Sequence, residues 1–282
     1  MVFDTNETLK LIEGITIPPA PFILKQLHQE LQKDEPVLMD IANIISQDVG
    51  MSALILRTIN SPFFSLRTKV RSIQHAASLL GITYVINIVT GLSLKRTFEE
   101  SGGANPPNYW DSPTNIAMIA ANVARVVSGV EPDEMYMLGL FHNAGHALLS
   151  QRFPDYKEFL KKNVNREDII ITEIEDQQYN TDHAVLSYYL ARSWKLDSHI
   201  VEVIRDHHNT KEQLTEMDGE ACTKGRLLAI LKIAEHVDKI FWKMDPDSEW
   251  VQIENVVLDY LGMSKPDFDD LQADMLDKLI SG

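Results

Sequence analysis

Apolar residues recur at spacings of three and four along most of the chain, and this helical period restricts the fold more than any other feature. Ile41, Ile44 and Ile45 form one stripe, which Leu54 and Ile55 continue in the next segment. Because an α-helix has 3.6 residues per turn, residues at these spacings share one helix face. Further amphipathic stretches cover residues 114–127, 134–151, 182–194, 198–208 and 227–243. We therefore predict an all-α fold built from many helices.

The segment Ile82–Val89 is rich in β-branched residues, which favour strands. Its apolar residues Ile82, Val85, Ile86 and Val89 nevertheless share one face at helical spacing. Since packing outweighs weak intrinsic propensities, the sequence predicts a buried helix here.

Three polar residues mark the limits of the helix that contains Leu54. Asp48 is placed to cap its start, because a carboxylate there accepts hydrogen bonds from the free amides of the first turn. The helix should end near Asn60, because Pro62 disfavours helical geometry at Ser61. We assign Asn60 and Ser61 a structural role in this turn and no catalytic role.

Residues 101–108 concentrate glycine, proline and asparagine and have no periodicity, which predicts a domain boundary. We expect an N-terminal helical subdomain over residues 1–104 and a second helical subdomain over residues 105–282. The tail from residue 245 carries one apolar face, made of Trp250, Ile253, Val257 and Leu261. This face should pack on the domain or on a partner.

The chain carries 26 Lys and Arg against 41 Asp and Glu, a formal net charge of -15. Such a field repels phosphate backbones and anionic lipid headgroups, so we expect no direct nucleic-acid partner. Arg67, Lys69 and Arg71 form a local basic group, which we interpret as a solvated face.

The chain has a single cysteine, Cys222, which cannot form an internal disulfide and fits a reducing compartment. Its first residues are not a basic and then apolar leader. The uncharged run of residues 76–94 contains too many polar residues and glycines to be a membrane span. We therefore expect a cytoplasmic protein with no membrane association.

Seven of the nine histidines lie in the second half of the chain: His142, His146, His183, His199, His207, His208 and His236. Neutral imidazole is a common metal ligand. His142 and His146 have the spacing of the zinc-protease motif, but Asn143 stands where that motif has its glutamate. An amide cannot act as general base near neutral pH, so we exclude protease chemistry.

Several segments resemble the HDOD family (HD-related output domain), which is related to HD-type metal-dependent phosphohydrolases. The run Tyr136–Gly145 is similar to the Gly-Leu-Leu-His-Asp-Ile-Gly core of HD enzymes, with Asn143 in place of the aspartate. The other matching segments, in order, are residues 17–21, 45–48, 57–61, 73–81 (which ends at Gly81), 182–185, 194–196, 204–208 and 233–235. The resemblance implies an HD-like helical bundle that usually serves as a non-catalytic output module in bacterial signalling.

Carried over by resemblance, His142, His183 and one of His207 and His208 match ligand positions, and Glu235 matches the final aspartate. Ser112-Pro113 provides no imidazole at the first position, and Asn143 brings no charge to bridge two cations. We therefore predict a degenerate HD site with no catalytic residues and no binuclear centre. A single divalent metal on His142, His183, His208 and Glu235 is left open.

Adjacent residues on a helix point about 100° apart, so we expect only one of His207 and His208 to face this site. Ile200 and Ile204 share a stripe with His208 at a spacing of four, which favours His208.

Three functions follow from these observations. The first is a non-catalytic signal-transduction output and binding module, whose partner is a signalling protein or a small ligand. The alternative is a metal-dependent phosphohydrolase acting on a nucleotide or cyclic dinucleotide, and the third is a helical adaptor without a small-molecule site. Because the resemblance begins near the N-terminus, we expect the signal to arrive from a separate protein or ligand.

Overall fold

The computed structural model describes residues 14–64, 66, 68–100, 108–163, 170–216, 222–242 and 247–281. The predicted boundary at residues 101–108 lies outside these ranges except for Asn108, so the division into two subdomains stays a prediction. One hydrophobic core runs through the described residues of both halves.

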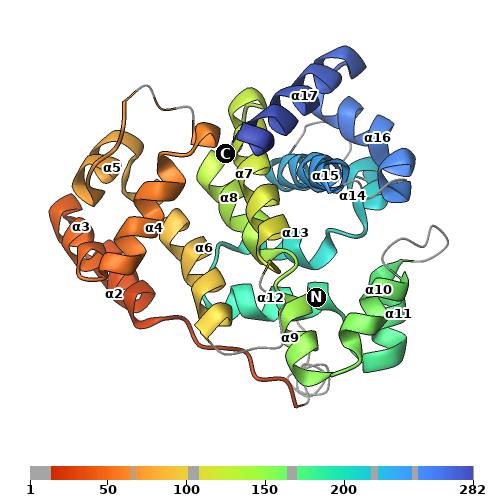
Figure 1. Ribbon diagram of the computed structural model, residues 1–282, viewed down its shortest axis with the longest axis horizontal. Helices are drawn as coiled ribbons and strands as arrows, with labels where there is room; N and C mark the ends of the chain where they lie inside the picture. The colour runs from red at the N-terminus through yellow and green to blue at the C-terminus, as the bar shows by residue number, and fades with distance from the viewer. Residues whose placement is uncertain are drawn as a thin grey trace.

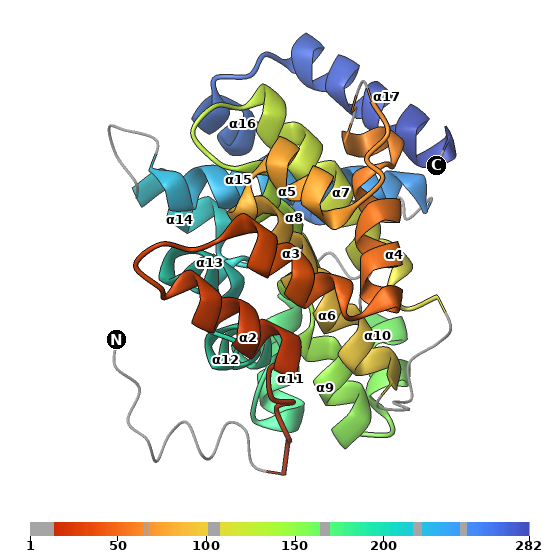
Figure 2. The same cartoon turned by 90° about the vertical axis from the view of Figure 1, so that its left-hand side faces the viewer.

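The first group of helices fills one side of the molecule (Figure 1). Figure 2 views this side directly, with α2, α3 and α5 in front. Its elements are α2 (Phe22–Leu31), α3 (Leu38–Ser46), α4 (Val49–Ile59), the short 3-10 helix η1 (Pro62–Phe64), α5 (Ile73–Leu80) and α6 (Ile82–Glu100).

The second group forms the rest of the molecule, around a central set of α7, α8 and α15 (Figure 1). Its elements are α7 (Asp111–Val126), α8 (Pro132–Phe141), α9 (Gly145–Arg152), α10 (Tyr156–Asn163), α11 (Ile171–Tyr179), α12 (His183–Ser193), α13 (Ser198–Asp206), α14 (Thr210–Glu216), α15 (Thr223–Phe241), α16 (Ser248–Leu261) and α17 (Lys265–Ser281).

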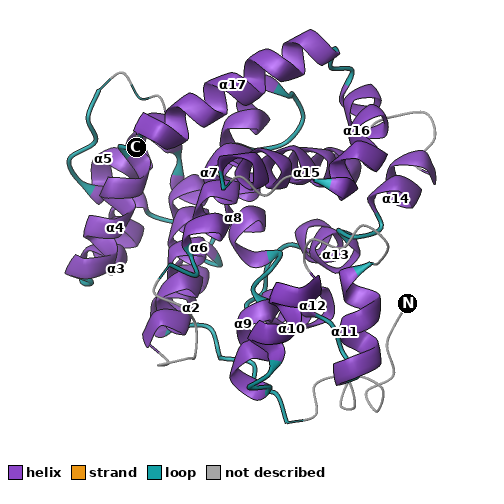
Figure 3. Cartoon of the chain, turned by 45° about the vertical axis from the view of Figure 1, so that its right-hand side comes forward, coloured by secondary structure: helices purple, strands orange, loops and turns teal. Residues whose placement is uncertain are grey.

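The all-α prediction is confirmed. All regular structure in the described residues is helical, as Figure 3 shows by its purple helices and teal loops. The segment Ile82–Val89 is helical and belongs to α6, as its period predicted. Val85, Ile88 and Val89 of this helix are fully buried. α6 packs against both α4 and α8, and so it joins the two groups of helices.

The predicted limits of α4 are confirmed. The Asp48 side chain accepts a hydrogen bond from the Met51 amide (2.9 Å), and α4 ends at Ile59. Asn60 then ties the end of α4 to the following loop: its Nδ2 donates to the carbonyls of Leu56 (2.7 Å) and Val70 (2.8 Å), while its Oδ1 accepts from the Val70 amide (2.8 Å). These three hydrogen bonds support the structural role assigned to Asn60.

Gly81 separates α5 from α6 with a φ of +95°. Only glycine adopts this backbone conformation without strain, so Gly81 sets the sharp change of direction between the two helices.

The C-terminal tail packs on its own chain. Trp250, Ile253 and Val257 of α16 are buried, and α16 and α17 both lie against α15. Among the described residues, none of the helices combines the length and the apolar character needed to cross a bilayer.

Candidate functional site: a buried histidine cluster

The predicted site histidines come together where four helices begin or end. His142 follows the last residue of α8, His183 is the first residue of α12, and His207 follows the last residue of α13. Gly145 at the start of α9 makes this convergence possible. A Cβ atom there would lie 2.0 Å from the carbonyl oxygen of His183, so any larger residue would push α9 and α12 apart.

Two hydrogen bonds that His183 donates to Glu175 of α11 orient the His183 ring. Its Nδ1 lies 2.7 Å from Glu175 Oε2, and its backbone amide donates to the same oxygen at 2.9 Å. The opposite ring nitrogen, Nε2, lies 2.9 Å from His208 Nε2. A carboxylate behind a histidine is the usual way in which proteins orient a metal-binding imidazole.

His142 and His207 are completely buried and are oriented by backbone carbonyls. His142 Nδ1 contacts the Gly139 oxygen at 2.9 Å, and His207 Nδ1 contacts the Ile204 oxygen at 2.7 Å. These contacts place a proton on each Nδ1 and direct each Nε2 into the cluster. Neither Nε2 makes a hydrogen bond within the described residues, and His142 Nε2 faces Glu235 Oε1 at 3.3 Å.

Both His207 and His208 face the cluster, which corrects the expectation that only one could. The centroid of the His183 ring lies 5.5 Å from that of the His207 ring and 4.8 Å from that of the His208 ring. The expectation assumed a continuing helix, but α13 ends at Asp206 and both histidines lie in the turn that follows.

A buried lysine occupies the carboxylate side of the cluster. Lys232 of α15 is fully buried, and its ammonium lies 2.8 Å from Glu235 Oε2 and 2.7 Å from Glu249 Oε1. Sequence reasoning did not find Lys232. The one available signal was that Lys232 interrupts the apolar run of residues 227–234, three residues before Glu235.

The electrostatic environment divides the cluster into charged pairs and neutral rings. Burial, reinforced by the Lys232 charge, holds the pKa of His207 well below its ordinary value, and burial does the same to the pKa of His208. Burial alone would raise the pKa of Glu235, but the Lys232 ammonium outweighs it and holds that pKa well below the ordinary value. Burial alone would also lower the pKa of His183, but Glu175 outweighs it and raises that pKa.

A second set of residues, His146, Tyr156 and Glu175, supports the His183 ring. Sequence reasoning considered His146 only for its spacing from His142, and it missed Tyr156 and Glu175. His146 stacks on the His183 ring with a centroid separation of 3.9 Å, and its Nδ1 contacts the Tyr156 hydroxyl at 2.6 Å. The Tyr156 hydroxyl donates to Glu175 Oε1. Burial and the neighbouring His183 lower the pKa of His146 to about 3, so this ring is neutral at physiological pH.

The position that lacks a histidine is taken by a different polar contact. The Ser112 hydroxyl donates to Asp238 Oδ2 (2.5 Å), and Asn115 Nδ2 donates to Asp238 Oδ1 (2.9 Å). Asp238 lies one turn beyond Glu235 on α15. Ser112 is therefore part of a hydrogen-bonded link between α7 and α15.

Two sets of donor atoms among the described residues could each hold a cation, and both include His183: His183 with His207 and His208, and His183 with His146 and Glu175. In the second set Glu175 already accepts hydrogen bonds from the His183 amide and the Tyr156 hydroxyl, so the first set is the better candidate. The ligand atoms of His183, His207 and His208 all lie within 4.8 Å of one another, and imidazoles suit zinc and similar ions once the nitrogen that binds the metal has lost its proton. This set includes His207, which the sequence did not favour as a ligand, and leaves out the predicted His142 and Glu235. A second cation would require a bridging carboxylate, but Asn143 is an amide whose buried Oδ1 accepts no hydrogen bond within the described residues. Glu235 is already paired with Lys232.

Comparison with known proteins identifies the family. The model of the HDOD domain matches residues 17–210, more than half of the chain, and the protein therefore belongs to the HDOD family. The chain is 23% identical over 210 residues to an uncharacterized protein of Treponema pallidum. That alignment covers 72% of this chain and 41% of the curated relative, so the chain spans less than half of that relative's length.

Solved structures share the fold. An HDOD domain protein of unknown function from Geobacter sulfurreducens aligns with a TM-score of 0.68 and 20% identity, over 98% of this chain and 94% of that one. A Shewanella amazonensis protein provisionally described as a phosphohydrolase aligns with a TM-score of 0.68 and 21% identity, over 96% of this chain and 93% of that one. A Marinobacter aquaeolei protein provisionally described as a signal transduction protein aligns with a TM-score of 0.66 and 20% identity, over 98% of this chain and 63% of that one. At these identities the likeness establishes the fold alone.

Proposed function

We propose that this chain is a non-catalytic binding and output module of bacterial signal transduction, and that its HD site is degenerate. The observation that carries the proposal is the buried Lys232 ammonium paired with Glu235 at 2.8 Å. An HD hydrolase uses carboxylates to offset the mutual repulsion of two divalent cations. Here a fixed internal cation neutralises the one carboxylate that resemblance assigns to metal binding.

Two further defects act in the same direction. Asn143 has no charge to bridge cations, and Ser112 hydrogen-bonds to Asp238 where the family's enzymes place a histidine. A productive metal site must hold its geometry to within roughly 0.5 Å. Repairing one of three defects should therefore raise metal affinity without assembling the nucleophile.

The alternative is a metal-dependent phosphohydrolase acting on a nucleotide or cyclic dinucleotide. The observation that favours it is the set of three imidazoles within 4.8 Å of one another. When bound there, a divalent ion would supply Lewis acidity. His183, His207 and His208 would hold it, and Glu175 would keep the His183 ring oriented toward it. The described residues of the cluster offer no unpaired carboxylate to receive a proton from an attacking water.

The test is an assay of the wild type and Asn143→Asp against phosphomonoesters, nucleotides and cyclic dinucleotides with added manganese, iron or magnesium. We expect turnover at background for both proteins. His142→Ala removes a cluster residue, and His75→Ala, an exposed histidine on α5, is its matched control. Metal-dependent turnover in the wild type that is lost on chelation and in His142→Ala, but kept in His75→Ala, would establish the hydrolase instead.

A further inference from the structure

A large cleft lies away from the histidine cluster, between the two groups of helices. Its volume is about 1220 Å³, and its walls come from α4, the loop after α4, α6, α7, α8 and α17. Small-molecule sites typically occupy roughly 300–1,000 Å³. The cleft is thus large enough for a ligand of nucleotide size.

The charge of the cleft is opposite to that of the chain. The chain has a formal net charge of -15. Five of the side chains that line the cleft are nevertheless basic and only one, Glu99, is acidic; the basic ones are Arg57, Lys69, Arg71, Lys95 and Arg96. A basic cavity in an acidic surface concentrates small anions.

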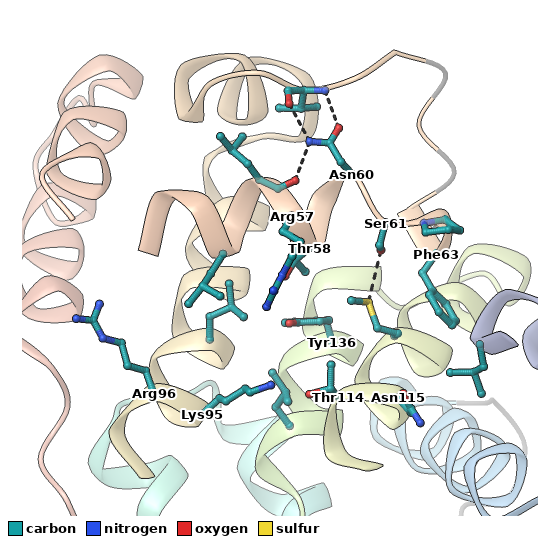
Figure 4. A pocket seen from close by; sticks show the side chains of 18 of the residues that line it. Arg57, Thr58, Asn60, Ser61, Phe63, Lys95, Arg96, Thr114, Asn115 and Tyr136 are labelled. Atoms are coloured by element: carbon teal, nitrogen blue, oxygen red, sulfur yellow. Dashed lines mark hydrogen bonds between the residues drawn. The ribbon is translucent and has the colours of Figure 1, made fainter. Parts of the chain in front are cut away.

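Four of the five basic side chains are available to a ligand. Arg96 is engaged outside the cavity, since it pairs with Asp48 (2.5 Å) and Glu100 (2.6 Å). Arg57, Lys69 and Arg71 are exposed and form no ion pair with a described residue. Lys95 approaches Glu99 only at 3.9 Å. In Figure 4, Arg57 and Lys95 point from α4 and α6 toward the middle of the cavity, while Arg96 points away.

The fold fixes the backbone that carries these basic side chains. Arg57 and Lys95 stand on helices. Lys69 and Arg71 flank Val70, whose amide and carbonyl are both hydrogen-bonded by the Asn60 side chain (Figure 4). Asn60 therefore fixes the basic loop beside the Arg57 end of α4. A cationic site that is ordered before binding loses less entropy on binding a ligand.

The remaining walls are apolar, with a few polar groups between them. Leu54, Leu92, Met118 and Leu140 line the cavity, and the buried ring of Tyr136 lies at its floor. Thr114 and Asn115 of α7 also line the cavity (Figure 4), although the Thr114 hydroxyl donates to the Trp110 carbonyl (2.5 Å) and Asn115 Nδ2 donates to Asp238 Oδ1 (2.9 Å). A ligand for this cleft needs an anionic group for the basic side and a flat or apolar body for the other side.

We propose that this cleft binds a nucleotide, whose phosphates contact Arg57, Lys69, Arg71 and Lys95 and whose base lies against the apolar wall that includes Tyr136. The proposal gives the binding module of the previous section its ligand, and so it rests on that function. A small anion fits better than a polynucleotide, because the basic groups line a concave site while the chain as a whole repels a long polyanion.

The test uses fluorescence titration of the full chain with ATP and GTP, together with adenosine and a 12-residue single-stranded RNA. The cleft variant is Arg57→Glu/Lys95→Glu. The control is Lys157→Glu/Lys161→Glu on α10, which makes the same change of charge at exposed positions that do not line the cleft. Circular dichroism verifies that both variants fold.

We expect saturable binding of at least one of the two triphosphates, weakened at least tenfold in the cleft variant and less than twofold in the control. Adenosine should bind at least tenfold more weakly than ATP. The proposal is overturned if neither triphosphate binds saturably, if both variants weaken binding equally, or if the RNA binds more tightly than the triphosphates. His142→Ala should leave nucleotide affinity unchanged, so turnover that this variant abolishes would refute the proposed function and not the cleft.

Discussion

Helix α8 contributes to both the basic cleft and the histidine cluster, and the two sites differ in whether their charged side chains have partners of opposite charge. Tyr136 and Leu140 of α8 line the cleft, and His142 follows the last residue of the same helix. In the cluster each charged group has a buried partner: Glu175 with His183, and Lys232 with Glu235. In the cleft Arg57, Lys69 and Arg71 have no charged partner within the described residues. The charges of the cluster are paired within the protein, whereas these basic side chains of the cleft have no such partner in the described part of the chain.

This difference predicts that single charges have large effects on stability in the cluster and small effects in the cleft. Lys232→Met leaves Glu235 buried without its ammonium, and breaking a buried ion pair costs about 3–5 kcal/mol. Arg57→Glu changes an exposed side chain and should change stability by less than about 0.5 kcal/mol. Urea denaturation measures both values.

The double variant Lys232→Met/Glu235→Gln sharpens this prediction. Because it leaves no unpaired charge at position 235, it should recover more than half of the stability that Lys232→Met loses. Equal losses in the single and double variants would show that Lys232 contributes by packing alone.

Asn60 and Ser61 are neighbours at the edge of the cleft, and their substitutions by alanine should differ in how much stability they cost. Asn60→Ala removes three hydrogen bonds and leaves the Val70 amide and carbonyl without partners, which should cost about 2 kcal/mol. Ser61→Ala removes one contact with the Met118 sulfur at 3.9 Å and should cost less than about 0.5 kcal/mol. Thermal unfolding of both variants checks this, and equal costs would contradict the role given to Asn60.

Asp238→Asn should have a smaller effect on stability than Asn60→Ala, and this effect depends on pH. Burial raises the pKa of Asp238 to about 6, although the hydrogen bonds from Ser112 and Asn115 oppose this. Because the folded state then binds a proton more tightly than the unfolded state, this group adds stability as pH falls through 6. The gain is about 1 kcal/mol between pH 7 and pH 5. The Asp238→Asn variant should not show this gain when the free energy of unfolding is measured at pH 7 and pH 5. The same pH dependence in the wild type and the variant would refute the role given to Asp238.

The fold could be predicted from the sequence because its signals are local. The three-and-four period identified α6 despite its β-branched residues, and Asp48 and Pro62 marked both ends of α4. Gly81 lies in the backbone conformation that only glycine adopts easily.

The sites were harder to predict because they depend on contacts between distant segments. Lys232 and Glu175 look like ordinary charged helix residues until the fold buries them beside Glu235 and His183. The joint participation of His207 and His208 depends on where α13 ends, which the sequence placed two residues too late. Lys69 and Arg71 were interpreted as a solvated face, and only the fold brings them to the same cavity as Arg57 and Lys95.

The central claim is that the histidine cluster can hold one cation and cannot assemble a binuclear centre. The most direct test is elemental analysis of protein purified without chelators and without an affinity metal, followed by titration with zinc, manganese and iron. With three imidazoles in reach of one another and Glu235 neutralised by Lys232, we predict no more than one ion per chain at saturation. Two ions per chain, both lost in His142→Ala, would contradict the claim.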